Sequence, residues 1–344
     1  MAYSTIDKAT LYANTITYSG TGADTNAITG VGFQPDFVWI KEKSSTSNHA
    51  LYDVLRGTTK KLESDGSGPE QTEATTFASF DSDGFTVNNN AQVNESGQTY
   101  VSWNWKMGTT SGLSGGTITP SAYSINTTAK QGIYKYTGTG SAATIAHGLG
   151  VVPTLIIVKD LGATENWQIY HQSTGATKYF TFTNNAESAQ TSRWNDTAPT
   201  STLFTVGTDS SVNSSGNTYI AYVFSDVKGY SKMSTYKGTG QNTQGQFIYT
   251  GFKPSFVLIK NWAGSEDWHL YDNKREYSFN LANKTLDPNQ TSAEYTISDG
   301  IDLYSNGFRT WTSGSALNTA GQEYIYAAFG QTMVGTNGVA GTAR

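Results

Sequence analysis

The chain has 344 residues, a formal net charge of −5 and only 14% Asp, Glu, Lys and Arg, where about 25% is usual. A mildly acidic chain lacks the basic stripe of a nucleic-acid surface, so we expect no nucleic-acid partner. Cysteine is absent, which excludes disulfides and thiolate metal sites. No apolar run reaches the roughly 18 residues of a membrane helix, so we expect no membrane insertion.

One phrase occurs three times along the chain. It reads "GFQPDFVWIK" at 32–41, "GVVPTLIIVK" at 150–159 and "GFKPSFVLIK" at 251–260. Each copy follows an aromatic residue with Gly-Thr-Gly and precedes a closing segment, "TYVSWNW", "TYIAYVF" or "EYIYAAF". The period of roughly 100 to 120 residues is too long for a solenoid or propeller blade and fits complete small domains in tandem.

Taken in order, the segments of each repeat read as strands. The phrase opens with proline, which cannot donate to a β-ladder and favours a strand start. Both alternating sets of residues after Pro35 are apolar, which predicts a strand covered on both faces, as in the centre of a sandwich. Asp83-Gly84 and Asn306-Gly307 are typical of hairpin turns. We therefore predict an all-β chain of three tandem antiparallel β-sandwich domains, jelly-roll-like in type.

The anchors also predict the domain limits. The first repeat covers residues 1–106, the second 132–230 and the third 231–330. Residues 107–131 are rich in Gly, Ser and Thr and are typical of a flexible or loosely docked linker, whereas the junction between repeats 2 and 3 is short. Repeats 2 and 3 are therefore expected to pack as a pair, with repeat 1 more independent. Residues 331–344 form a Gly- and Ala-rich tail without a strand pattern.

The search for catalytic chemistry is negative, and we expect no catalytic residues, no cofactor and no metal site. Asp53 with Arg56, and Asp272 with Arg275, share one spacing and are interpreted as local ion pairs that orient a loop. His49 falls in the position that tryptophan holds in the other two repeats, which indicates packing. The lysines that end the repeated phrase are expected to lay their methylenes on apolar surface and to place their ammonium groups in water.

Residues that differ between repeats are the better candidates for function, because loops accept change at little cost to the core. Trp262 and Trp268 flank a polar loop of repeat 3 that contains Asp267, and Trp194 lies in a polar loop of repeat 2. Planar aromatic rings beside Asn, Asp and Gln can hold sugars. These four residues are the candidate glycan- or partner-binding site, with packing of the tryptophans in the core or between repeats as the alternative.

The chained phrases, from "VGFQPDFVWIK" and "HALYDVLRGTTK" through "YTGTGSAATIAHGLGVVPTLIIVKD" to "GFKPSFVLIKN" and "WHLYDNKREY", resemble a family of virion-associated proteins of tailed, especially marine, bacteriophages. Members are described as tail-fibre-like or structural. The resemblance covers nearly the whole chain. It implies a component of the phage particle, in the tail or on the capsid, and it brings no catalytic residues. An N-terminus without a signal-like pattern agrees with a protein released by lysis.

We therefore expect a non-enzymatic structural protein of the virion surface, a tail fibre or tail-tip component with host-surface glycan as its candidate ligand. A capsid-decorating head appendage is the alternative within this class. A polysaccharide-degrading tail enzyme is the alternative from another class, and a cellular glycan-binding module is a third. The expected partners are other virion proteins, and a homo-oligomer, a trimer by default, is the expected assembly.

Overall fold

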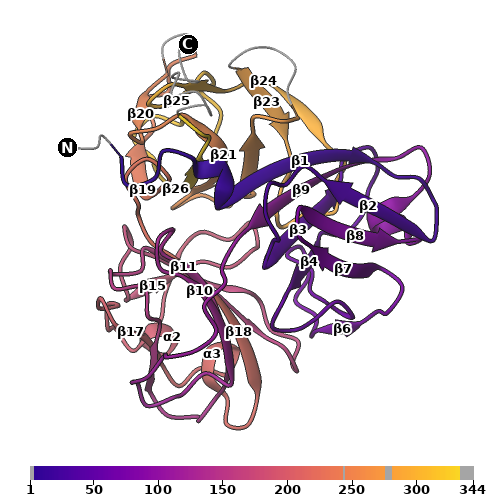
Figure 1. The fold of residues 1–344 in the computed structure, drawn as a ribbon. Coiled ribbons are helices and arrows are strands. Elements are labelled where there is room, and N and C mark those ends of the chain that lie inside the picture. The colour runs from indigo at the N-terminus through magenta and orange to yellow at the C-terminus, as the bar shows by residue number, and fades with distance from the viewer. Residues whose placement is uncertain (1–3, 243–244, 276–280, 334–344) are drawn as a thin grey trace.

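The computed structural model describes residues 4–242, 245–275 and 281–333. Strands and antiparallel sheets dominate this part of the chain, with only short helices between them. Figure 1 shows three lobes around a common centre, in chain order from indigo to yellow. The prediction of an all-β chain built from antiparallel sandwich repeats is confirmed. The last residues of the expected tail, 334–344, lie outside the described residues.

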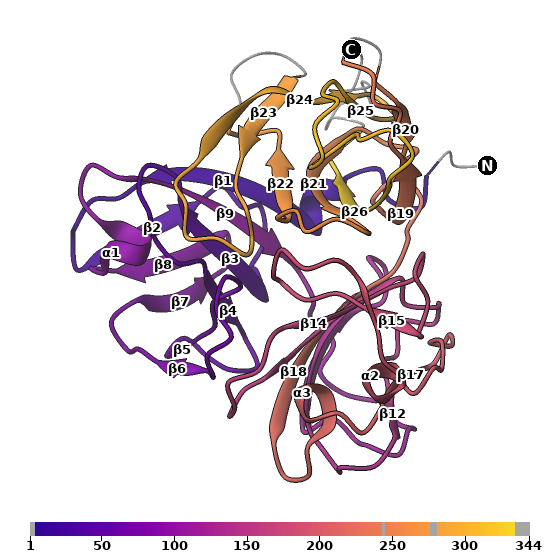
Figure 2. The same ribbon diagram turned by 180° about the vertical axis from the view of Figure 1, so that it is seen from behind.

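Each repeat has one sheet at the centre of the molecule, which we call its inner sheet, and one or more smaller sheets outside it (Figure 2). The three inner sheets share a strand order. The inner sheet of repeat 1 runs β1 (Ala13–Ser19), β9 (Thr99–Trp105), β3 (Phe37–Glu42), β4 (Ala50–Asp53). In repeat 2 it runs β10 (Ala122–Asn126), β11 (Gln131–Thr137), β18 (Thr218–Phe224), β13 (Leu155–Asp160), β14 (Gln168–His171). In repeat 3 it runs β19 (Ser231–Lys237), β26 (Glu323–Gly330), β21 (Pro254–Asn261), β22 (His269–Asp272).

A second layer, the outer sheet, packs on the far side of each inner sheet. In repeat 1 it runs β2 (Thr25–Thr29), β8 (Gly84–Asn88), β7 (Phe77–Asp81). In repeat 2 it is β12 (Ala143–Ala146) with β17 (Leu203–Val206), and in repeat 3 it runs β20 (Phe247–Tyr249), β25 (Gly307–Thr310), β24 (Tyr295–Tyr304), β23 (Leu281–Thr285). The remaining elements are short: η1 (Ala9–Leu11), β5 (Lys60–Lys61), β6 (Gln71–Thr72), α1 (Ala91–Asn94), β15 (Lys178–Tyr179), β16 (Ser188–Ala189), α2 (Thr191–Trp194) and α3 (Ser210–Asn213).

Every inner sheet is buried on both faces, but by two different partners. Along β3, Val38 and Ile40 point into the sandwich of repeat 1, whereas Phe37 and Trp39 point the other way, into a core shared by all three repeats. All six residues of the strand are buried. Side chains of successive strand residues point to opposite faces, so the apolar run in the sequence serves two cores at once. We call the shared cluster the central core.

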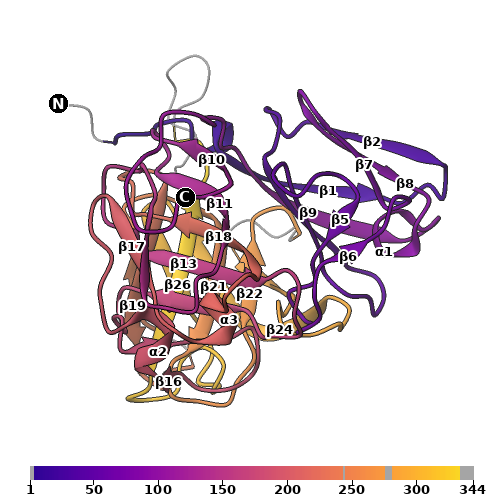
Figure 3. The same cartoon turned by 90° about the horizontal axis from the view of Figure 1, so that it is seen from below.

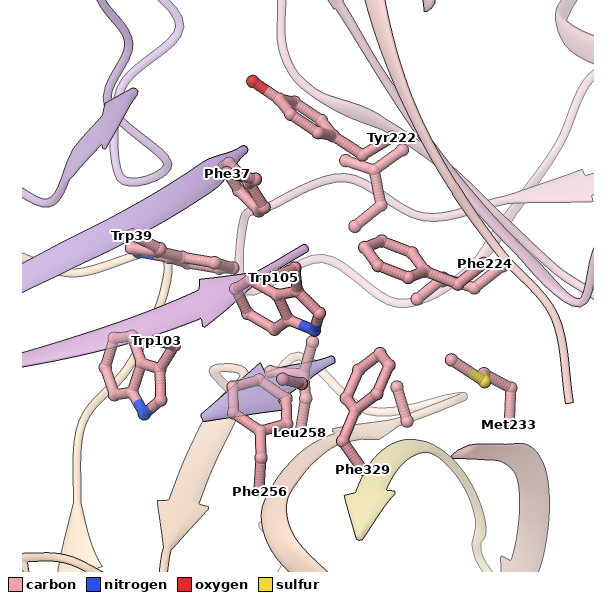
Figure 4. Close-up of a cluster of buried hydrophobic side chains, with 14 of the residues drawn as sticks. Phe37, Trp39, Trp103, Trp105, Tyr222, Phe224, Met233, Phe256, Leu258 and Phe329 are labelled. Carbon is pink, nitrogen blue, oxygen red and sulfur yellow. The ribbon is translucent and has the colours of Figure 1, made fainter. Parts of the chain in front are cut away.

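The central core is aromatic at its middle. Trp105, Phe224 and Phe329 stand at equivalent places at or next to the ends of β9, β18 and β26, and their ring centroids lie 5.4 to 6.1 Å apart in all three pairs. Figure 4 shows these rings converging from the three repeats, with Phe37 and Phe256 beside them. Such tilted and edge-on ring pairs add to the stabilisation that apolar burial alone gives. The three repeats are therefore joined by a core of their own.

The segment 107–131 is not the flexible linker that its composition predicts. Residues 122–126 form β10, which pairs with β11 in the inner sheet of repeat 2. Earlier in the segment, Gly116 and Ile118 bridge to Ile145 of β12, and Ile118 is buried. Small polar residues suit this role because the segment lies across a sheet at close range: a Cβ on Gly116 would stand 2.7 Å from a backbone oxygen of Thr144.

Repeat 1 is also not more independent than the other two. Its Trp39, Trp103 and Trp105 are at most 3% exposed because repeats 2 and 3 cover them. Seen from below, in Figure 3, the long strands β1 and β9 of repeat 1 run from its outer lobe to the side of the other two repeats. A separated repeat 1 would expose these three large indoles to water, at a cost of several kcal/mol at roughly 25 cal/mol per Å².

This shared core predicts joint unfolding. A single proteolytic cut in the exposed stretch 114–117 should leave both fragments in one complex on native size exclusion, and thermal unfolding of the uncut chain should show one transition. The physical reason is that neither fragment alone can bury the residues that it contributes to the central core. Fragments that separate without denaturant, or a resolved early transition for repeat 1, would contradict the shared core.

Candidate functional site

Two of the four residues expected to bind a ligand are packing residues. Trp194 is 1% exposed and lies edge-on to Tyr170 inside the sandwich of repeat 2. Trp268 is 2% exposed, and its ring meets Phe182 of repeat 2 in the central core. Packing, the alternative that the sequence analysis kept for each tryptophan, is what the structure shows at both positions: the neighbouring residues are polar, but the ring turns inward. Neither tryptophan offers a surface to a ligand.

The other two candidates also serve internal contacts. Trp262 is partly buried against the central core, and its carbonyl accepts from the backbone N–H of Glu187 in repeat 2. The Asp267 carboxylate is half-buried and accepts from the side-chain amides of Asn289 and Gln290. The structure therefore does not gather the four predicted residues into one exposed site.

A ring of three hydrogen bonds links the repeats in cyclic order. The indole N–H of Trp167 in repeat 2 donates to the carbonyl of Glu63 in repeat 1, at 2.8 Å. Trp268 of repeat 3 does the same to Thr181 of repeat 2, at 2.8 Å. His49 of repeat 1 closes the ring, because its Nε2 lies 3.1 Å from the carbonyl oxygen of Asp287 in repeat 3.

The tautomer of His49 follows from its second contact. Its Nδ1 accepts from the indole N–H of Trp39, at 2.8 Å, so Nε2 carries the proton and donates to repeat 3. Burial lowers the pKa of His49 well below its usual value, which keeps the ring neutral. A neutral imidazole here takes the structural place of an indole, in agreement with the packing role expected from its position in the repeat.

The two Asp–Arg pairs are present as predicted, but they lie at the boundaries between repeats and not on an exposed loop. In repeat 1, Arg56 Nε donates to Asp53 Oδ2 at 2.5 Å, and both side chains are fully buried. The hydroxyl of Tyr222 from repeat 2 donates to the same carboxylate oxygen at 2.7 Å. A buried carboxylate needs such partners, because an unpaired buried charge is strongly unfavourable.

Repeat 3 builds the same boundary with a different donor. Arg275 Nε donates to Asp272 Oδ2 at 2.6 Å, and the indole N–H of Trp103 from repeat 1 donates to that oxygen at 3.0 Å. Trp103 and Tyr222 occupy the same place on β9 and β18. The two pairs are thus matched contacts of repeat 1 with repeat 2 and of repeat 3 with repeat 1.

Repeat 2 departs from this pattern for a physical reason. The residue of repeat 3 that corresponds to Tyr222 is Ala327, which has no side-chain donor to offer a carboxylate. His171 stands in repeat 2 where the others have aspartate, and its Nε2 lies 3.2 Å from the backbone oxygen of Tyr326. Burial lowers the pKa of His171 to about 4, so the ring is neutral at pH 7.

The repeated lysines also differ from the expectation, because their ammonium groups are not in water. Lys41, Lys159 and Lys260 are all fully buried. Lys159 Nζ donates to its neighbouring carbonyl at 2.8 Å and to that of Ser67 in repeat 1 at 3.3 Å. Lys260 Nζ likewise reaches Asn184 of repeat 2 at 3.3 Å. Removal from water lowers the pKa of all three to about 8.

The contacts described above involve His, Lys, Asp and Arg, which are residue types that often take part in catalysis. The buried histidines, lysines and Asp–Arg pairs at the boundaries all have structural partners. Among the described residues no group of His, Cys, Asp and Glu is placed to hold a metal ion. No helix in the described parts of the chain is long and apolar enough to cross a membrane.

In the part of the chain that the structure describes, the exposed aromatic surface lies on the outer sheet of repeat 3. On β20, Ile248 is buried in the sandwich, whereas Phe247 and Tyr249 point outward and are 37% and 61% exposed. Phe247 meets the ring of Tyr304 edge-on, with centroids 5.8 Å apart. We call the outward-facing rings and the arginine between them the aromatic face; they are Phe247, Tyr249, Tyr304, Arg309 and Trp311.

Charge lies between the rings of the aromatic face. The Arg309 guanidinium stands 6.0 Å from the centroid of Tyr304 and 5.3 Å from that of Trp311, which is cation–π geometry. The Tyr304 hydroxyl donates to Asp302 at 3.2 Å. Gly307 makes the arrangement possible, because a Cβ there would stand 2.8 Å from the Phe247 ring. The result is a row of rings with a cation at its centre, beside Asp302, which is only 8% exposed.

Repeats 1 and 2 have nothing comparable on their outer sheets. By strand register, repeat 1 has Ala27, Thr29 and Asp81 in place of Phe247, Tyr249 and Tyr304. In repeat 2 the corresponding edge is covered by the segment that bridges at Gly116 and Ile118. No sequence pattern singles out this surface, because "FIY" at 247–249 has the same form as "FVW" at 37–39, whose two rings are buried.

The fold and this surface define a closed assembly of three sandwich repeats in a single chain, with one repeat specialised on its outer sheet. The chain belongs to the family described as Domain of unknown function (DUF7483), whose model matches residues 8–332. The match spans all three repeats. No curated protein and no solved structure matches the chain.

The boundary contacts predict that substitutions of two equally buried tryptophans lower the free energy of unfolding by different amounts. Trp103→Phe removes a donor to the buried carboxylate of Asp272, whereas Trp167→Phe removes a donor to the neutral carbonyl of Glu63. Hydrogen bonds to charged groups contribute about 1.5–3 kcal/mol and neutral ones about 0.5–1.5. Trp103→Phe should therefore lower the free energy of unfolding by about 1 kcal/mol more than its control, in urea titrations. Equal losses would contradict the role assigned to Asp272.

The buried histidines predict acid sensitivity. His171 titrates near pH 4 when folded and near 6.5 when unfolded. Between these values the unfolded chain binds the extra proton, so stability falls as pH drops from about 6.5 to 4. His171→Gln should reduce the loss between pH 7 and 4.5 by about 2–3 kcal/mol relative to the parent chain. Urea titrations at the two pH values measure it, and an unchanged pH dependence would contradict the neutral buried ring.

Proposed function

We propose that this chain is a non-enzymatic structural protein of a tailed-bacteriophage particle, a tail-fibre or tail-tip component, and that it contacts host-surface glycans through the aromatic face. The observation that carries the binding part is the row of outward rings on β20, on β24 and directly after β25, found on one repeat of the three. The virion assignment rests on the resemblance of the repeated phrases to virion-associated proteins.

The chemistry of the aromatic face suits a sugar. Flat apolar rings cover the C–H faces of a pyranose, while groups at the ring edge bond its hydroxyls. Phe247 and Trp311 supply the rings, and the guanidinium of Arg309 supplies donors between them. A binding surface on a rigid sheet also loses little conformational entropy when it is occupied.

The proposal that the chain is not an enzyme is supported by the contacts that its buried polar groups make. His49, His171 and both Asp–Arg pairs are held between repeats, away from any substrate. The carboxylate of Asp267, one of the candidate binding residues, is held by the side-chain amides of Asn289 and Gln290. A polysaccharide-degrading enzyme is the rival function, and incubation with host-envelope polysaccharide separates the two. Release of reducing ends would overturn the non-enzymatic assignment.

The location in the particle is a separate test. Antibody labelling of intact particles should place the chain at the tail, together with other virion proteins, and native mass measurement should give its assembly, with a homotrimer as the proposed state. Labelling on the head would favour the capsid-decorating alternative. Absence of the chain from purified particles would refute the virion assignment.

The glycan contact predicts selective loss in two variants. Phe247→Ala and Trp311→Ala should each weaken binding of host-surface glycan by tenfold or more, because each removes a stacking ring and leaves the sandwich core intact. Val152→Ala is the control, since Val152 is 48% exposed on repeat 2 and is not part of the aromatic face. A glycan array with unfolding midpoints for each variant measures it, and equal binding by all three would refute this surface.

A further inference from the structure

A short stretch of the chain covers one side of the repeat 2 sandwich, where the edges of its inner and outer sheets lie. The backbone N–H groups of Thr117 and Ile118 both donate to the carbonyl of Thr144 on the edge strand β12, at 2.9 Å. Further on, the backbone N–H of Ser121 donates to the carbonyl of Lys135 on β11, at 2.8 Å. The stretch therefore connects the two sheet edges, and the Ile118 side chain belongs to the sandwich core.

Repeat 1 presents the same two carbonyls without such a cover. By strand register, Ala27 of β2 corresponds to Thr144, and Thr17 of β1 corresponds to Lys135. The alternation of an antiparallel ladder turns the backbone groups of both residues away from their partner strands. Both residues are exposed, and within the described part of the chain no hydrogen bond reaches either carbonyl. Figure 3 shows β2 at the rim of the repeat 1 lobe.

The side chains beside these carbonyls are also less covered in repeat 1. Tyr134 and Tyr136 of repeat 2 are fully buried. Their counterparts by register, Ile16 and Tyr18, are only partly buried and pack at the margin of the repeat 1 core. We call residues 16–18 together with Ala27 the open edge of repeat 1. It combines unbonded backbone acceptors with apolar side chains that a further segment would bury.

The surroundings of the open edge are acidic. Asp24 directly precedes β2, Glu95 follows α1, and Asp83 lies in the hairpin between β7 and β8; all three are exposed. The segments 13–35 and 77–105, which form the strands around this edge, contain no lysine or arginine. The Asp83 carboxylate accepts from two backbone N–H groups, which are neutral donors. A basic segment is therefore attracted here, whereas the same edge of a second copy would be repelled.

We propose that the open edge of repeat 1 binds an extended, basic segment of a partner protein, in the way that residues 115–121 cover repeat 2. Backbone N–H groups of the segment bond the carbonyls of Ala27 and Thr17, which is addition of a strand to a sheet edge. A branched apolar side chain of the segment packs against Ile16, and flanking lysines or arginines face the carboxylates. The inference concerns repeat 1 and does not depend on the glycan contact of repeat 3.

The covered edge of repeat 2 also indicates which residue the segment needs at its closest approach. A Cβ on Gly116 would stand 2.7 Å from the backbone oxygen of Thr144, so only glycine passes there without a shift. The partner segment is therefore expected to carry glycine before its branched apolar residue, as "GGTI" does at 115–118.

The test is fluorescence anisotropy of the full chain with a labelled peptide, "KGGTITPSK", which places residues 115–121 between two lysines. The matched peptide "EGGTITPSE" has the opposite flanking charge. The parent chain should bind the basic peptide at least tenfold more tightly, and the difference should shrink as salt rises from about 0.05 to 0.5 M.

Variants of the chain locate the binding. Ala27→Pro places a ring at the outward backbone nitrogen and leaves the ladder with β8 intact, so it should weaken binding by tenfold or more. Ala27→Thr, which keeps that N–H, is its matched control and should bind as the parent does. Asp24→Asn combined with Glu95→Gln should weaken binding by fivefold or more. Asp196→Asn, at an exposed aspartate of repeat 2, should leave it unchanged.

Three outcomes would overturn the inference. The basic peptide binds no better than the acidic one, or Ala27→Pro binds it as the parent does, or native mass measurement shows a dimer that Ala27→Pro abolishes, which would assign the edge to a second copy. Unfolding midpoints within about 2 °C of the parent show that a loss of binding is not a loss of fold. Phe247→Ala should leave peptide binding unchanged, so this inference and the proposed function can fail separately.

Discussion

The inner strands are apolar on both faces, and this is the constraint on which the rest of the structure depends. A strand such as β3 cannot leave either face in water without losing the stabilisation that its burial provides. The outer sheet of its own repeat covers one face. The other face needs apolar surface of the same kind, which the remaining two repeats supply at Phe224 and Phe329. Three repeats are thus enough to close the arrangement, and none of them completes its burial alone.

When the three repeats pack together, polar atoms are buried at the boundaries between them. At each boundary these atoms need hydrogen-bond partners. The chain meets this requirement with different residues in equivalent places. Where a tyrosine or tryptophan donor faces the boundary, an aspartate held by arginine receives it. Where Ala327 offers no donor, His171 replaces the aspartate and turns to a backbone oxygen. Compensation of this kind is expected when a buried carboxylate would otherwise lose its partner.

The repeated phrases were sufficient to predict the sandwich repeats and the double burial of the strand after Pro35. They were insufficient to predict what covers the second face, because a neighbouring sheet and a neighbouring repeat leave the same apolar pattern. For the same reason Trp194 and Trp268 looked like surface residues: their neighbours are polar, and only the fold shows the direction of the ring. The aromatic face was out of reach for a related reason, because Phe247 and Tyr249 flank an apolar residue as the buried Phe37 and Trp39 do.

Because the three repeats lie in one chain, each can differ in sequence from the others. A surface can therefore occur once in the molecule, and this sets the number of binding surfaces per chain. In a trimer of identical subunits any surface occurs three times, and weak contacts gain strength through simultaneous engagement. Here the aromatic face occurs on the third repeat alone, so under the proposed function one chain would engage one glycan segment at that surface. Avidity would then come from the number of chains displayed together and from their spacing. Selection on such a protein would act on copy number and arrangement as strongly as on the affinity of the surface itself.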